Sequence, residues 1–76
     1  MAAGLLLFLT ACDQVDEYTL YRSSPLDLSA RIHLATFDAS DRNPYNQQNC
    51  EITKELFAKQ SGVNVRYWCE KGRYRK

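Results

Sequence analysis

The stretch Asn43–Cys69, NPYNQQNCEITKELFAKQSGVNVRYWC, decides the fold. Its first half predicts a helix, because Asn43 is a suitable N-cap and Pro44 suits the first helical position, where no N–H is needed. Spacings of four, three and four place one set of residues on a single helical face, which we expect to pack on the domain: Tyr45, Asn49, Ile52 and Leu56. Gly62 suits the left-handed position that ends a helix.

The second half, residues 63–70, alternates as a strand does. Val63, Val65, Tyr67 and Cys69 point to one side; Asn64, Arg66, Trp68 and Glu70 point to the other. Cys50 lies beside the apolar stripe of the helix, and Cys69 lies on the apolar side of the strand. Thiols from consecutive packed elements are suitable partners, so we predict a Cys50–Cys69 disulfide.

The length of the chain limits the number of domains, and its charges are unevenly distributed. A chain of 76 residues forms one domain at most, and so small a core is marginal without a disulfide or similar cross-link. The net charge of +1 is unevenly spread: four carboxylates and one arginine give −3 over residues 13–30, whereas five cations and one carboxylate give +4 over residues 66–76. The chain is therefore acidic near its start and basic at its end.

Two strands are expected before the helix. Residues 18–22 are rich in β-formers, and residues 31–37 carry apolar groups on both faces, as interior strands do. Residues 26–30 fit a loop or a single helical turn. The order favours an α/β fold in which strands 31–37 and 63–70 pair in parallel across the helix, a β-α-β unit. The alternative is a small α+β fold, with the helix packed on antiparallel strands.

The N-terminal residues suggest a location. Residues 1–11 are apolar but shorter than the roughly 20 residues that span a bilayer. Leu9-Thr10-Ala11-Cys12 resembles the lipobox of bacterial lipoproteins. The resemblance implies that residues 1–11 are a signal peptide removed by signal peptidase II, that Cys12 carries the lipid (a diacylglyceryl group and usually an acyl chain such as palmitate), and that residues 12–17 form a tether to a single disulfide-linked domain at 18–76.

The resemblance also implies residence on the periplasmic side of a cell membrane, and Asp13 directly after the cysteine favours the inner membrane. The sequence departs from the family in one respect, because Met1-Ala2-Ala3-Gly4 lacks the usual positive charge. The alternative for this segment is an ordinary N-terminal helix with a free Cys12.

Aromatic and basic residues alternate near the C-terminus. They form a candidate binding surface: Arg66, Trp68, Lys71, Arg73, Tyr74, Arg75 and Lys76. Such residues suit an anionic envelope component, whether lipid headgroups, lipopolysaccharide or peptidoglycan, or an envelope protein. Nucleic acid is not expected for an exported protein. The alternative is a solvated tail that aids solubility.

No arrangement of residues predicts catalysis. His33 is the only histidine and lies in a strand between Ile32 and Leu34, which is typical of a structural role. The cysteines form no C-x-x-C pair, and Asp38, Asp41 and Asn43 lack the glycine and glutamate of a calcium loop, so no metal or cofactor is expected.

We therefore expect a non-enzymatic binding or accessory lipoprotein of the cell envelope. Two alternatives remain. One is a lipoprotein of the type encoded by phages or mobile elements, which excludes phage by blocking an envelope receptor. The other is a cytosolic, basic module that binds nucleic acid and carries no lipid.

Overall fold

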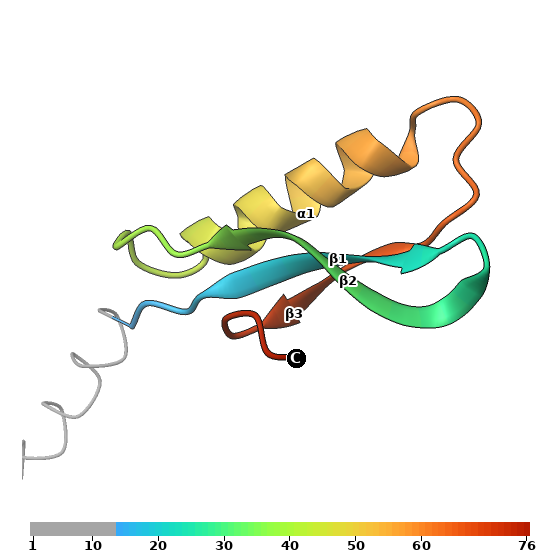
Figure 1. Ribbon diagram of the computed structural model, residues 1–76. Coiled ribbons are helices and arrows are strands. Elements are labelled where there is room, and N and C mark those ends of the chain that lie inside the picture. Colours follow the sequence, from blue (N-terminus) through green and yellow to red (C-terminus); the bar gives the residue numbers. More distant parts are fainter. Residues whose placement is uncertain (1–13) are drawn as a thin grey trace, which may run out of the picture.

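The computed structural model describes residues 14–76. Its elements are β1 (Tyr18–Ser24), β2 (Asp27–Phe37), α1 (Tyr45–Ala58) and β3 (Tyr67–Lys71). The strands form one antiparallel sheet in the order β2-β1-β3, and α1 packs on one face of it (Figure 1). The fold is therefore small α+β, the second of the two expected classes.

β1 and β2 form a hairpin closed by Pro25 and Leu26, with Ser24 opposite Asp27 and Tyr18 opposite Phe37. The turn is held locally, since the Ser24 hydroxyl accepts from the Leu26 amide at 3.1 Å. Residues 27–30, expected in a loop or a helical turn, are part of β2. Asp27 lies opposite Ser24 across the tight turn, and an irregularity in register then places residues 28–31 against Ser23 alone, before regular pairing resumes at Ile32.

The expected direct pairing of strands 31–37 and 63–70 was wrong. β3 pairs with β1, with Leu20 opposite Cys69, so that β1 lies between β2 and β3. The hairpin explains this: β2 occupies one edge of β1, and only the other edge is left for the strand that returns from the helix. β2 and β3 do run in the same direction, because both are antiparallel to β1. β3 is also shorter than expected and starts at Tyr67.

The predicted disulfide is confirmed. Cys50 on α1 is bonded to Cys69 on β3, with a Cα–Cα distance of 6.2 Å, within the usual range for a bridge. Cys50 is fully buried. On the same side of the sheet Leu20 is fully buried, and the Phe57 and Tyr67 rings lie 5.6 Å apart. These contacts form the core between the helix and the sheet.

The prediction of which helix face is buried was wrong. Tyr45, Ile52 and Leu56 are 46%, 57% and 59% exposed, whereas Asn46 and Cys50 are buried. Two constraints set the rotation of the helix. One is the bond to Cys69, and the other is Asn46, whose amide nitrogen donates to the carbonyls of Ala39 (2.9 Å) and Asp16 (3.0 Å) and whose oxygen accepts from the Ala39 amide (3.0 Å).

Asn43 does not cap the helix, which begins at Tyr45 without a side-chain cap. Its side-chain oxygen instead accepts from the Asp16 backbone amide at 3.0 Å, and its side-chain nitrogen donates to the Asp16 carboxylate at 2.7 Å. The backbone amide of Asn43 donates to the Gln14 carbonyl. Residues 14–17, assigned to the tether, are thereby bonded to the start of α1. The predicted signal peptide, Cys12 and Asp13 lie outside the described residues.

Candidate functional site

The sheet face opposite α1 carries a group of ring side chains, the aromatic face: Tyr21, His33, Trp68 and Tyr74. Tyr21 is at its centre and is fully buried. Because Tyr21 and Trp68 are direct cross-strand partners, they share this face, and their rings stack at 5.9 Å. Tyr74 lies over His33 with a centroid distance of 4.6 Å.

An ion pair orders these rings. Arg31 donates to the Glu70 carboxylate at 2.8 Å and to the Tyr21 hydroxyl at 2.9 Å, and the Trp68 indole donates to Glu70 at 2.8 Å. The hydrogen bonds from Arg31 and then from Trp68 lower the pKa of Glu70, and the bond to Glu70 raises the pKa of Arg31. Both groups are therefore charged at neutral pH, and their hydrogen bonds hold the Tyr21 and Trp68 rings in place.

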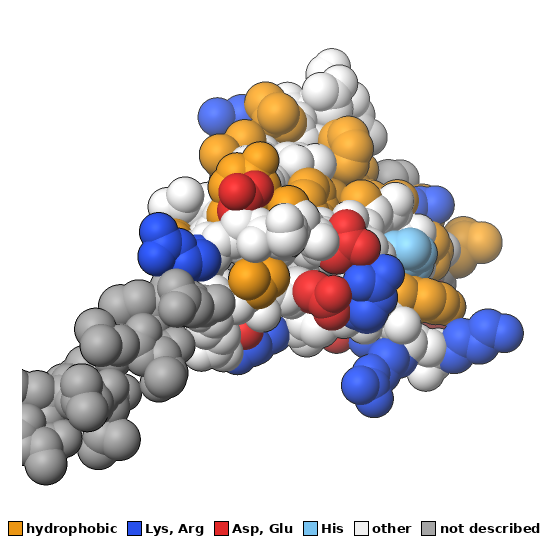
Figure 2. Space-filling model, turned by 90° about the vertical axis from the view of Figure 1, so that its left-hand side faces the viewer, with side chains coloured by type: hydrophobic (Ala, Val, Ile, Leu, Met, Phe, Trp, Pro, Cys, Tyr) orange, Lys and Arg blue, Asp and Glu red, His pale blue; other side chains and the backbone are white. Residues whose placement is uncertain are grey.

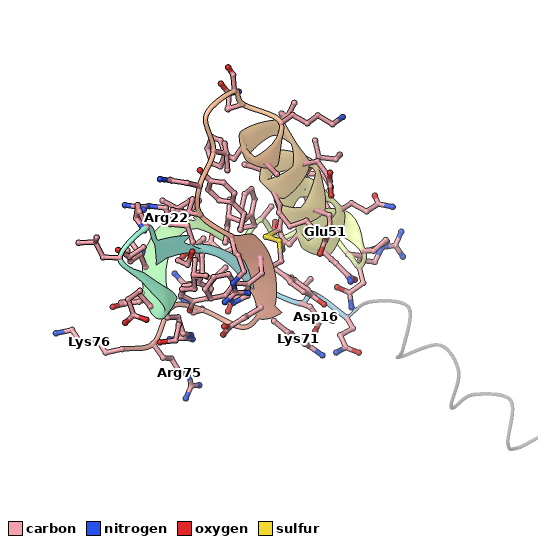
Figure 3. All side chains as sticks on the ribbon, turned by 90° about the vertical axis from the view of Figure 1, so that its right-hand side faces the viewer. Asp16, Arg22, Glu51, Lys71, Arg75 and Lys76 are labelled. Atoms are coloured by element: carbon pink, nitrogen blue, oxygen red, sulfur yellow. A yellow bond between two sulfur atoms is a disulfide. The ribbon has the colours of Figure 1, made fainter. Side chains whose placement is uncertain are left out.

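The C-terminal residues fold back over the aromatic face. Gly72 adopts a φ of 107°, which favours glycine, and the Thr19 hydroxyl donates to its carbonyl at 2.7 Å. Beyond it, the Arg31 side chain donates to the Arg75 carbonyl. This course places Tyr74 over His33 and leaves the side chains of Arg75 and Lys76 on the side of the sheet away from α1 (Figure 3).

The predicted binding surface is divided by the fold. Arg66, Trp68, Tyr74, Arg75 and Lys76 belong to the aromatic face or its rim, and the Arg66 guanidinium lies 5.0 Å from the Trp68 ring centre.

Lys71 and Arg73 are directed elsewhere, toward the acidic start of the chain. The Lys71 ammonium is 3.6 Å from the Asp16 carboxylate. Arg73 is 2.9 Å from Glu17 and 3.1 Å from Asp38, and these bonds raise its pKa. Much of the charge imbalance along the sequence is thus neutralised by internal pairs.

Three cations remain at the rim of the aromatic face. Within residues 14–76, Arg66, Arg75 and Lys76 have no carboxylate partner among the ion pairs, and the Arg66 guanidinium donates to the Leu28 carbonyl at 2.8 Å. The face therefore combines stacked rings with uncompensated positive charge. Such a surface can hold an anionic group by charge while its rings contact an adjoining apolar or planar part.

Sequence reasoning missed Tyr21 and His33 as members of the aromatic face, and it missed Arg31 as the partner of Glu70 and Tyr21. The alternation of residues 66–70 placed Trp68 and Glu70 together, but it did not say which residues of other strands lie beneath them. That depends on β1 being the central strand, which the tight turn at Pro25 and Leu26 could have indicated.

A hollow of about 490 Å³ lies on the other side of the sheet, between α1 and the end of β2. It is lined by Phe37, Asp38, Ala39, Tyr45, Asn46, Asn49 and Thr53. Its one carboxylate, Asp38, is bonded to Arg73, and Asn46 is bonded to the backbone. The hollow thus presents apolar, hydroxyl and amide groups beside one carboxylate that is already paired.

Comparison with protein-family models, curated proteins and solved structures finds no match for the chain. Within the described part of the chain, no group of three or more His, Cys, Asp or Glu side chains could hold a metal ion. Among those same residues, no helix is long and apolar enough to cross a membrane.

The Glu70–Arg31 pair predicts a pH-dependent stability. Because the folded protein lowers the pKa of Glu70, its contribution is present above the unfolded pKa of about 4.3 and is lost as pH falls through the lower folded pKa. At pH 7 we expect Glu70→Gln to lower the free energy of unfolding by at most about 1 kcal/mol, since solvent screens this partly exposed pair.

The measurement is urea unfolding of both proteins at pH 7 and at pH 2. The difference between wild type and variant should shrink at the lower pH. An equal difference in the free energy of unfolding at both pH values would show that the charge of Glu70 does not cause the effect.

Proposed function

We propose that this chain is a small lipid-anchored protein of the bacterial cell envelope that acts as a non-enzymatic binding module. The observation that carries the proposal is the sequence Leu9-Thr10-Ala11-Cys12, which resembles a lipobox and makes Cys12 the acceptor of the lipid. The Cys50–Cys69 disulfide supports it, because such bonds persist in oxidising compartments such as the periplasm.

The anchor would hold the domain close to the leaflet. Gln14, two residues after Cys12 in the sequence, is held to the domain, because its backbone carbonyl accepts from the Asn43 backbone amide. Each buried CH₂ of an acyl chain contributes about 0.8 kcal/mol, so a cysteine with several chains is a stable anchor. With so short a link, anionic headgroups are the first envelope component that the domain meets.

The aromatic face is the binding surface in this proposal. Its uncompensated cations, Arg66, Arg75 and Lys76, are attracted to an anionic leaflet by roughly 1 kcal/mol each. Trp68 and Tyr74 are of the residue types that favour the membrane–water interface. The face therefore suits contact with anionic headgroups of the leaflet that holds the anchor, with the inner membrane favoured by Asp13.

The test of the anchor is lipid labelling of the full chain in a Gram-negative host. An alkyne-tagged palmitate should label the wild-type protein in the membrane fraction. The Cys12→Ala variant should take up no label, because the acceptor thiol is gone.

A matched control uses the other two cysteines. The Cys50→Ala/Cys69→Ala variant should keep the label, since these thiols form the disulfide and accept no lipid. A wild-type chain without label, or equal labelling of the Cys12→Ala variant, would refute the anchor.

A further inference from the structure

The hollow between α1 and the end of β2 is lined by residues of two kinds. Phe37 and Tyr45 are aromatic, whereas Asn49 and Thr53 contribute an amide and a hydroxyl. Its volume of about 490 Å³ lies within the roughly 300–1,000 Å³ of small-molecule sites. Figure 2 shows hydrophobic side chains interrupted by white polar and backbone atoms over the upper part of the molecule, where α1 lies. The hollow therefore suits a ligand that has both an apolar face and hydrogen-bonding groups.

Asn49 has a side-chain amide that the described protein leaves without a partner. Asn49 is half-buried, and its backbone carbonyl accepts from the Thr53 hydroxyl at 2.8 Å. Its side chain, in contrast, makes no hydrogen bond to any group of residues 14–76. The amide of Asn46, one turn earlier, is fully used within the fold. Because a side-chain amide has N–H donors and a carbonyl acceptor next to each other, Asn49 can form two hydrogen bonds with another amide.

The loop that forms one wall of the hollow is fixed by the fold. The Asn46 oxygen accepts from the Ala39 amide at 3.0 Å, and the Asn46 nitrogen donates to the Ala39 carbonyl at 2.9 Å. Arg73 lies 3.1 Å from the Asp38 carboxylate and neutralises its charge. This wall therefore has its shape before a ligand binds, and binding loses little conformational entropy there.

The charge and the polar groups of the lining select among classes of ligand. Asp38 is the one charged residue among the described lining residues, so an anionic headgroup finds no cation in the lining. A hydrocarbon chain would displace water from the Asn49 amide and the Thr53 hydroxyl and leave both without partners. A neutral ligand that carries its own amide avoids both costs.

We propose that the hollow is a binding site for an N-acetylated hexose. One face of a pyranose ring carries C–H groups, which pack on aromatic side chains such as those of Phe37 and Tyr45. The acetamido group has one N–H and one carbonyl, which match the oxygen and the nitrogen of the Asn49 side chain. Ring hydroxyls can bond to the Thr53 hydroxyl and to the second carboxylate oxygen of Asp38.

Two components of a bacterial envelope carry such sugars, namely the glycan strands of peptidoglycan and the headgroups of glycolipids. The proposal concerns the sugar that both share, and it rests on the proposed function only for access to these components. The site uses residues of α1 and of the end of β2 with the loop that follows, and it includes neither Cys12 nor the aromatic face. Failure of the sugar site therefore leaves the anchor and the leaflet contact unaffected, and the converse also holds.

The test is a titration of the full chain in detergent with the β-1,4-linked trisaccharide of N-acetylglucosamine, followed by NMR of the backbone amides. The signals of Asn49 and Thr53 should shift and approach saturation by about 10 mM sugar. Two control ligands should bind at least about tenfold more weakly. Cellotriose has the same rings and linkages without the acetamido groups, and N-acetylalanine amide has the amide without the ring. Equal binding of either control, or no saturable shift with the trisaccharide, would overturn the proposal.

The Asn49→Ala variant should bind the trisaccharide at least about tenfold more weakly than wild type. The matched control is Gln47→Ala, which removes an exposed amide about 160° around the helix from Asn49 and should bind as wild type does. An intact Cys50–Cys69 disulfide and unchanged Trp68 fluorescence show that each variant is folded. Equal affinity of Asn49→Ala and wild type for the sugar would contradict the site.

Sedimentation with purified peptidoglycan distinguishes the two sources of the sugar. Co-sedimentation of the wild-type chain, lost in Asn49→Ala, would identify the glycan strands as the ligand. Binding of the trisaccharide without co-sedimentation would identify the sugar headgroup of a glycolipid.

Discussion

The Cys50→Ala/Cys69→Ala variant is expected to lose about 3 kcal/mol of its free energy of unfolding. The bridge joins residues 19 apart, and a loop of that size limits the unfolded chain by about this amount in the chain-entropy model. The loss is large because the core is small: of the apolar residues, only Leu20, Tyr21 and Cys50 are fully buried in the described chain. A domain of this size rarely has more than about 3–5 kcal/mol from its core.

Urea unfolding followed by the fluorescence of Trp68, the only tryptophan, measures this loss. Wild-type protein treated with a reductant should approach the stability of the double variant, since both lack the bridge. Ile52→Ala is the matched control on the same helix. Because Ile52 is 57% exposed, its truncation should cost far less than removal of the bridge. If the double variant lies within about 1 kcal/mol of wild type, the bridge does not support the core in this way.

The second large effect concerns contact between the aromatic face and an anionic leaflet. We expect the Arg66→Gln/Arg75→Gln/Lys76→Gln variant to lose about 100-fold in the equilibrium constant for this contact. Three basic residues at roughly 1 kcal/mol each give about 3 kcal/mol, and each 1.4 kcal/mol is a factor of ten. The contact should also weaken as salt is added, because mobile ions screen the charges.

Trp68 reports this contact directly. The lipidated protein is placed in vesicles that contain a lipid quencher at headgroup depth, with or without anionic lipid. Wild-type Trp68 should be quenched more strongly in the anionic vesicles, and the triple variant should lose that difference. The matched control is Lys59→Gln, which removes one cation at the end of α1, on the other side of the sheet. Equal quenching of wild type and triple variant would rule out these cations as the source of the contact.

The sequence was sufficient for the disulfide but not for the helix face. Cys50 was predicted to pair with Cys69 from its place beside the apolar stripe, and the bond is present. Cys50 and Ile52 are two residues apart, however, and so point about 160° away from each other around a helix. Both cannot face the sheet. The bridge and the three hydrogen bonds of Asn46 decide the rotation of the helix. Periodicity shows which residues share a face, but it does not show that these bonds outweigh the burial of the apolar stripe.

The order of strands in the sheet depended on which strand pairs with residues 31–37. The predicted parallel pairing treated residues 31–37 and 63–70 as neighbours, and it left the strand at 18–22 without a position. The turn at Pro25 and Leu26 makes that strand the partner of β2 and leaves its second edge to β3. Two contacts of the candidate site follow from this placement. Tyr21 of β1 stacks on its direct neighbour Trp68, and Arg31 of β2 reaches Glu70 of β3 across the central β1.

The most direct test of an anchored, disulfide-linked envelope protein is the intact mass of the chain from a membrane fraction, measured before and after reduction. We expect the mass of residues 12–76 plus acyl chains, with a gain of two hydrogens on reduction. A soluble chain of residues 1–76 with three free thiols would contradict the account.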